Sequence, residues 1–328
     1  MSSIHAAILA ALSVIAVSAF SSSAFAHCFV GARFLPATLA TDDPCVADEL
    51  SLPTVSVFDT GDEPSASEVD ISAELSKRIT PTIGLSIGST WSQISPPGVP
   101  SVNGFQNLET TIKWQLATLA RHEFVMSAGL SIEWGGTGTQ AVGAEPFSAY
   151  TPTVWFGKGF GDLPDSLDWL RPFAITGQVG YAIPGTAETL AVDPDTGDVD
   201  AEYHPQVLRW GGSLQYSMPY LRSNVVDLDL PEFLNRMNLI VEAALETPVA
   251  STLTSGGLTT GTVNPGIIWT GNYFQVGVEA IVPVNRQSGS NVGVIAQVHI
   301  YLDDLFPRSI GKPLFGGSMT PGRRTMGY

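Results

Sequence analysis

The chain has 328 residues, of which 44% are hydrophobic and only 14% are charged, and its formal net charge is −16. Because about a quarter of the residues in a soluble domain are charged, we expect much of this surface to face something other than water. The negative net charge and the lack of a basic stripe exclude a nucleic-acid partner.

Residues 1–26 have the pattern of a secretory signal peptide. An apolar stretch from Ala6 to Phe20 is followed by three serines and then by Ala24-Phe25-Ala26, which matches the A-x-A cleavage pattern. The residues before the apolar stretch include no Lys or Arg, so a retained membrane anchor is the alternative. Cleavage predicts a mature chain that begins at His27.

Residues 27–50 are predicted to form an N-terminal periplasmic segment ahead of the main domain. This segment contains both cysteines of the chain, Cys28 and Cys45. In an oxidising periplasm two nearby thiols usually pair, and closing a loop of this size contributes roughly 3 kcal/mol of stability. Two unpaired thiols are the alternative, and a metal site is disfavoured because only His27 is close and there is no C-x-x-C spacing.

Residues 51–302 alternate apolar with small or polar side chains at the period of a β-strand. Beyond the leader, no apolar run approaches the roughly 18 residues of a transmembrane helix. Since only helices and closed barrels satisfy every backbone polar group in lipid, the pattern indicates a barrel. The twelve candidate strands cover 55–57, 69–75, 83–91, 108–116, 124–134, 150–156, 173–183, 208–216, 237–245, 263–269, 274–282 and 292–302.

The connections between these strands are alternately short and long, which is typical of an outer-membrane barrel with periplasmic turns and longer extracellular loops. The predicted fold class is therefore all-β: an antiparallel transmembrane β-barrel of about 12 strands, with a range of 10–14. A soluble β-sandwich is the alternative. The connection at 219–235 is of medium length and is predicted to be a short helix or a lumenal plug. A Pro/Gly-rich tail at 303–328 leaves the identity of the closing strand open.

If the apolar set faces lipid, the opposite set must line the lumen. Acidic side chains outnumber basic ones in this set, which favours cations or neutral polar solutes over anions. The alternative is that the charges pair across the barrel and merely fill a narrow interior. The lumen-lining candidates are Asp70, Glu74, Glu109, Lys113, Glu133, Arg209, Glu242, Glu246, Glu279 and His299.

Two motifs of the sequence match patterns that carry other chemistry. Gly84-Leu85-Ser86-Ile87-Gly88 fits the G-x-S-x-G pattern of a hydrolase, but it lies inside a strand with no helix after it, so we interpret it as coincidence and predict no enzyme. A possible Ca²⁺ loop has carboxylates at alternating positions, although a solvated acidic external loop is favoured and no other cofactor is predicted. The carboxylates of this loop are Asp193, Asp195, Asp198 and Asp200.

Several segments resemble those of a proteobacterial outer-membrane group of exported barrels and transporters, related to the family named for the meta-pathway of phenol degradation. They are 31–44, 156–164, 170–184 and 302–316. The resemblance implies location in the outer membrane of a Gram-negative bacterium and passage of small aromatic or hydrophobic compounds. It brings no functional residues.

The predicted function is passive or facilitated diffusion of a small-molecule solute through a barrel in contact with outer-membrane lipids. Two alternatives belong to other classes. One is a barrel without transport that serves adhesion or structure through its long loops, and the other is a lipid-modifying enzyme.

Overall fold

The computed structural model describes residues 28–192, 199–250 and 257–316. The predicted leader at 1–26, the calcium-loop residues Asp193, Asp195 and Asp198, and the end of the tail at 317–328 lie outside this part of the chain.

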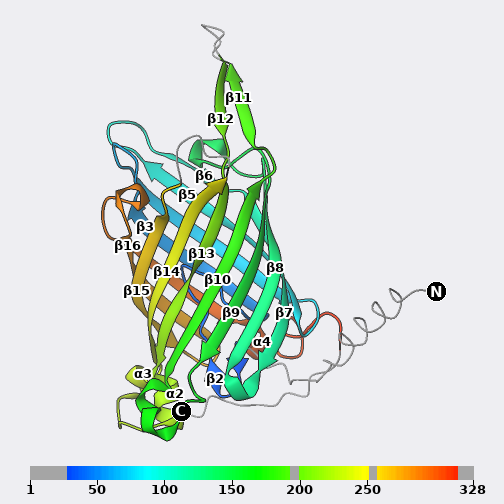
Figure 1. Ribbon diagram of the computed structural model, residues 1–328, viewed down its shortest axis with the longest axis vertical. Coiled ribbons are helices and arrows are strands. Elements are labelled where there is room, and N and C mark those ends of the chain that lie inside the picture. Colours follow the sequence, from blue (N-terminus) through cyan, green and yellow to red (C-terminus); the bar gives the residue numbers. More distant parts are fainter. Residues whose placement is uncertain (1–27, 193–198, 251–256, 317–328) are drawn as a thin grey trace, which may run out of the picture.

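The main sheet closes on itself as a barrel (Figure 1). It has 13 strands, of which the short β6 (Val102–Phe105) extends beside β5, and pairing of β4 with β5 closes the ring of the other twelve. The ring consists of β3 (Glu49–Asp59), β4 (Ser67–Arg78), β5 (Ile83–Ser95), β7 (Leu108–Leu119), β8 (Phe124–Trp134), β9 (Ala149–Gly159), β10 (Phe173–Pro184), β13 (Gln206–Ser217), β14 (Met237–Ala250), β15 (Thr260–Thr270), β16 (Phe274–Pro283) and β17 (Gly293–Tyr301).

All neighbours in the ring are antiparallel, so the predicted fold class and the count of twelve are confirmed. Each strand falls on one of the twelve apolar sets. The closing strand is β17, which pairs with β3. No ring strand is left with an unpaired edge facing its surroundings.

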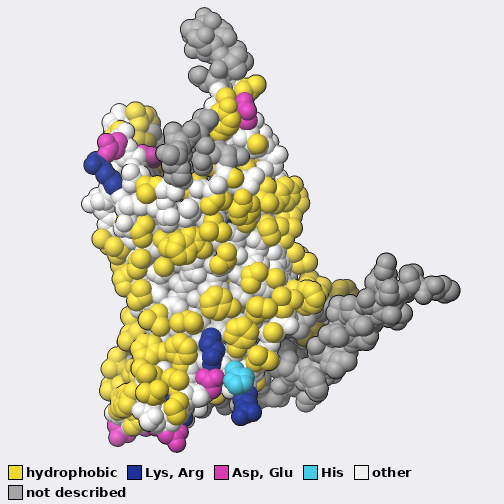
Figure 2. Space-filling model, viewed as in Figure 1, with side chains coloured by type: hydrophobic (Ala, Val, Ile, Leu, Met, Phe, Trp, Pro, Cys, Tyr) yellow, Lys and Arg dark blue, Asp and Glu magenta, His cyan; other side chains and the backbone are white. Residues whose placement is uncertain are grey.

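The outer surface of the barrel is apolar. Strand side chains such as Trp114, Val179 and Leu214 are 54%, 53% and 47% exposed. On the face drawn in Figure 2, hydrophobic side chains cover the strands and charged side chains gather toward the two ends. An apolar surface of this extent is not stable in water and marks contact with lipid.

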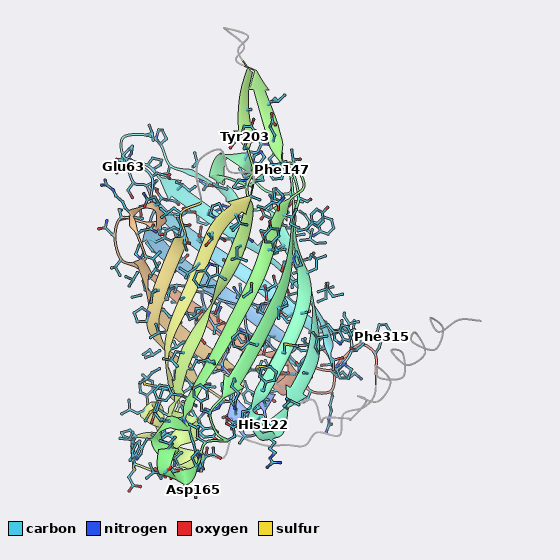
Figure 3. The ribbon with its side chains drawn as sticks, viewed as in Figure 1. Glu63, His122, Phe147, Asp165, Tyr203 and Phe315 are labelled. Carbon is cyan, nitrogen blue, oxygen red and sulfur yellow. A yellow bond between two sulfur atoms is a disulfide. The ribbon has the colours of Figure 1, made fainter. Side chains whose placement is uncertain are left out.

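The two ends of the barrel differ as predicted. One end carries the tight turns together with η3 (Asp165–Leu170), α2 (Met218–Asn224) and α3 (Glu232–Asn235), and the other carries the longer loops and a projecting hairpin of β11 (Glu188–Val192) and β12 (Val199–Tyr203) (Figure 1). In Figure 3, His122 and Asp165 mark the short-turn end, and Glu63 and Phe147 mark the long-loop end. Within the described residues no helix is both long and apolar enough to cross a membrane. The remaining short elements are η1 (Ala120–His122), η2 (Gln140–Val142), η4 (Arg286–Ser288) and α4 (Leu302–Leu305).

The connection at 219–235 contains the two short helices α2 and α3 and lies at the end of the barrel, so its alternative interpretation as a lumenal plug is wrong. The barrel does contain a plug, but a different segment forms it. Residues 28–48, called the plug from here on, contact inward-facing side chains of β7, β8, β10, β14 and β16. This differs from the expected separate segment ahead of the barrel.

Candidate functional site

The plug is a compact loop held together by the predicted disulfide, which is present between Cys28 and Cys45 with 5.3 Å between their Cα atoms. Its first residues form a small hairpin of β1 (Phe29–Val30) and β2 (Arg33–Phe34). The disulfide packs in a buried apolar cluster with Leu35 of the plug and Val125 of β8. The cross-link thus joins the two sides of the loop where the loop contacts the barrel wall.

Glu242 of β14 binds the far end of the plug. Its carboxylate accepts hydrogen bonds from the backbone N–H groups of Leu39 at 2.7 Å, Ala40 at 3.0 Å and Thr41 at 2.7 Å, and from Thr41 Oγ1 at 2.8 Å. Glu242 is fully buried. Hydrogen bonds to a charged acceptor are stronger than neutral ones, so this side chain is the principal polar anchor of the loop.

Two glycines of the barrel wall provide space for plug leucines. A Cβ atom on Gly157 would lie 2.6 Å from Leu35 Cδ1, and one on Gly277 would lie 2.6 Å from Leu39 Cδ1. Both distances are shorter than any normal carbon contact. The plug therefore approaches the strand backbone directly at these positions, and a larger inward residue there would push it away.

The base of the plug is fixed by two buried ion pairs. Arg33 Nε donates to Glu123 Oε2 at 3.1 Å, and its guanidinium lies 3.7 Å from the centre of the Tyr220 ring. Burial lowers the pKa of Arg33, and the charge of Glu123 acts in the opposite direction. At the other side, Asp48 accepts from Arg78 Nε at 2.7 Å. These pairs hold the point where the plug enters the lumen.

The plug leaves open space along one side of the lumen. A cavity of about 380 Å³ lies between the plug and the wall formed by β3, β4, β5 and β17, and a second of about 170 Å³ lies next to it. The two share the lining residues Asp42, Glu74, Thr111 and Gln178. The two cavities therefore adjoin each other beside the plug, and together they are called the path from here on.

The charges along this path are mostly negative. Asp42, Asp43, Glu49 and Glu74 line the larger cavity, and Glu109 lines the smaller. Lys113 opposes them: its Nζ lies 2.7 Å from Asp42 Oδ2 and donates to the carbonyl of Asp43 at 2.7 Å. Arg209 also lines the smaller cavity and pairs with Glu246. Because these two cations face five carboxylates along the path, the path carries an excess of negative charge.

The structure separates the ten lumen-lining candidates into groups. Five line the two cavities: Glu74, Glu109, Lys113, Arg209 and His299. The others bind other groups of the protein: Glu242 binds the plug, Glu279 interacts with Glu242, Glu246 pairs with Arg209, Asp70 accepts from Ser92, and Glu133 accepts from Asn107.

Sequence reasoning missed Asp42, Asp43, Glu49 and Ser51, which line the larger cavity. The signal that could have found them is indirect. Inward strand positions that lack a side chain, as at Gly157 and Gly277, indicate that another part of the chain fills the lumen.

The potential metal ligands are few in the described part of the chain. Of the calcium-loop carboxylates, Asp200 lies in β12, opposite Ala191 of β11. Among residues 28–192, 199–250 and 257–316, the one group of side chains close enough to share a metal ion is Cys28, Asp43 and Cys45. Its two cysteines are joined in the disulfide, so they offer no thiolate.

No protein-family model matches the chain, and no curated protein matches its sequence. Solved structures match in fold. An outer-membrane channel from Pseudomonas putida F1 has a TM-score of 0.52 at 10% identity, over 82% of this chain and 99% of that one. The NanC porin has a TM-score of 0.44 at 10% identity, over 76% and 98%, and the β domain of the Bordetella autotransporter BrkA has 0.44 at 11%, over 78% and 99%. This chain therefore has the barrel fold of an outer-membrane channel.

Proposed function

We propose that this protein is an outer-membrane channel for small solutes, which diffuse through the path between the plug and the wall of β3, β4, β5 and β17. The observation that carries the proposal is the pair of adjoining cavities beside the plug, which share four lining residues. The apolar exterior of the barrel supports its insertion in lipid. The proposal includes export through a leader at 1–26, after which the mature chain starts at His27.

The path favours neutral or cationic solutes over anions. Asp42, Glu74 and Glu109 lie along it, and Lys113 is engaged by Asp42 and Asp43. A ring of carboxylates sets a negative potential that repels anions. A cavity of about 380 Å³ suits a small organic molecule.

Small aromatic compounds, the solute class implied by the family resemblance, fall within this proposal when they are neutral or cationic. Trp155 lines the smaller cavity and presents its ring to Lys113, whose Nζ lies 4.7 Å from the ring centre. A planar solute could stack at this position in place of the lysine.

Planar-bilayer recordings of the purified protein under a KCl gradient test the proposal. We expect stable conductance with a reversal potential of the sign for cation selectivity. Swelling of protein-containing liposomes in neutral sugars of increasing size then gives the size limit. Anion selectivity would contradict the proposed path, and the absence of both conductance and swelling would favour a structural or adhesive barrel.

A further inference from the structure

Three polar side chains at the edge of the larger cavity form a row across β3 and β17. Ser51 Oγ lies 2.8 Å from His299 Nδ1, and His299 Nε2 lies 3.2 Å from Glu49 Oε2. Ser51 and His299 are directly opposite in the strand register, and all three residues line the cavity. When the imidazole proton is on Nε2, next to the carboxylate, Nδ1 accepts the hydrogen of the Ser51 hydroxyl.

We propose that Ser51, His299 and Glu49 form a nucleophilic site that cleaves small carboxylic esters held in the larger cavity. Ser51 is the nucleophile, His299 is the general base, and Glu49 is the positioning residue that stabilises the imidazolium. A serine is a weak nucleophile until an oriented base accepts its proton, and this row supplies each of the three roles. The activity goes beyond the proposed channel and does not depend on it.

The strand register is irregular around Ser51 and His299, as is common next to active sites. The register of β3 shifts between Ser51 and Thr54 against β4, and that of β17 shifts between Gln297 and His299. Such β-bulges re-aim side chains and are frequent next to active sites. Here Ser51 lies next to the imidazole of His299, and Thr54 also lines the cavity.

Thr54 lines the same cavity, and its hydroxyl is available to donate to the oxyanion of the proposed reaction. Its Oγ1 accepts a hydrogen bond from Gln297 Nε2 at 3.0 Å. A hydroxyl that accepts in this way retains its own hydrogen to donate. A donor that faces the developing negative charge lowers the activation barrier of acyl transfer.

The reaction balances without any co-reactant except water. Ser51 Oγ attacks the ester carbonyl carbon while its proton moves to His299 Nδ1. The ester C–O bond then breaks, and His299 returns the proton to the leaving alcohol. A water molecule attacks the acyl-serine, passing its proton to His299 and then to Ser51 Oγ, and the carboxylic acid is released.

The charge around the row defines the substrate class. Glu49, Asp43 and Glu74 line the same cavity, and Lys113 is already bound by Asp42 and by the Asp43 carbonyl. A neutral or cationic ester can enter this field, whereas an ester with a carboxylate in its acyl group is repelled.

Covalent labelling tests the nucleophile in the intact barrel. The purified protein in detergent is treated with diisopropyl fluorophosphate, which phosphorylates an activated serine with loss of fluoride, and the modified peptide is located by mass spectrometry. We expect one modified residue, Ser51. The matched control is Ser86→Ala, because Ser86 lines the same cavity without a histidine partner among its hydrogen bonds, and it should label like the wild type. Labelling elsewhere, or none in folded wild-type protein, overturns the proposal.

Hydrolysis of p-nitrophenyl acetate gives a second measurement. Ser51→Ala should reduce the rate to background, and His299→Gln should reduce it by about 100-fold or more. Glu49→Gln should lower the rate by at least about tenfold and change its pH profile, since it acts through His299. p-Nitrophenyl hydrogen succinate, which is anionic, should react more slowly than the acetate.

Equal hydrolysis by the wild type and Ser51→Ala would refute the site. Folding of each variant is checked by the different gel mobility of unheated and boiled samples, and bilayer conductance is recorded in parallel. Loss of hydrolysis with conductance still present is the expected result for Ser51→Ala, so failure of the site and failure of the channel are distinguishable.

Discussion

Replacing Glu242 by Gln is expected to release the far end of the plug. The carboxylate accepts four hydrogen bonds from Leu39, Ala40 and Thr41. A glutamine keeps one acceptor oxygen and turns its NH₂ group toward the remaining donors. If the amide oxygen takes the place of Oε2, which accepts three of the four bonds, the bond from the Leu39 N–H group is lost and the other three lose their charged acceptor. At about 1.5–3 kcal/mol for the lost bond and about 1 kcal/mol or less for each weakened one, docking weakens by about 3–6 kcal/mol.

The lower end of that range is the better expectation. Glu279 lies beside Glu242 and interacts with it as a like charge, so removing one of the two carboxylates offsets part of the loss. A loss of about 3 kcal/mol changes the ratio of docked to undocked plug by about 10²-fold.

Single-channel recording measures this change as a larger conductance or as more frequent transitions to a high-conductance level. Glu246→Gln is the matched control, because Glu246 lies on the same strand and pairs with Arg209 at 3.0 Å instead of binding the plug. If Glu242→Gln and Glu246→Gln gave the same conductance as the wild type, the Glu242 contacts would not be what keeps the plug in the lumen.

Three further predictions concern the plug and the path. Replacing both Cys28 and Cys45 by Ser should destabilise the plug by up to about 3 kcal/mol, which is measured as a lower unfolding temperature. A reductant should lower the unfolding temperature of the wild type but not that of this variant. Glu74→Gln combined with Glu109→Gln should move the reversal potential toward zero, whereas Glu63→Gln, at the long-loop end outside the two cavities, should not. Gly157→Ala should lower the free energy of unfolding by about 1–3 kcal/mol, because the added methyl group overpacks against Leu35. Leu35→Ala in the same chain should recover part of that loss, and a double-mutant cycle of unfolding free energies measures the recovery.

The strands could be predicted because lipid imposes a strict requirement on them. Outward positions in the lipid-facing band are mostly apolar, as at Ile112, Trp114 and Leu116 of β7, so the period of two recurs along the domain. The closing pair of β3 and β17 was harder to recognise, since the tail after Tyr301 obscured where the last strand ends.

The lumen could be predicted only in part, because inward positions meet no uniform solvent. Glu242 and Glu74 are both inward acids, yet one is a buried anchor and the other lines a cavity. The difference depends on where the plug lies, which no local pattern encodes. The contact of Ser51 with His299 depends on the register of two strands that are 248 residues apart in sequence, and this too lies beyond local reasoning.

The position of the plug has a consequence for the order in which the molecule assembles. Leu39 binds Glu242 across 203 residues and Ala37 binds Gln275 across 238, so these contacts form only once β14 and β16, late in the domain, are in place. The disulfide, by contrast, spans 17 residues and needs none of the barrel. A cross-linked loop that is already formed loses less chain entropy when the wall finally surrounds it. Oxidation of the two cysteines should therefore precede closure of the barrel, and a reduced chain should insert normally but complete its interior late.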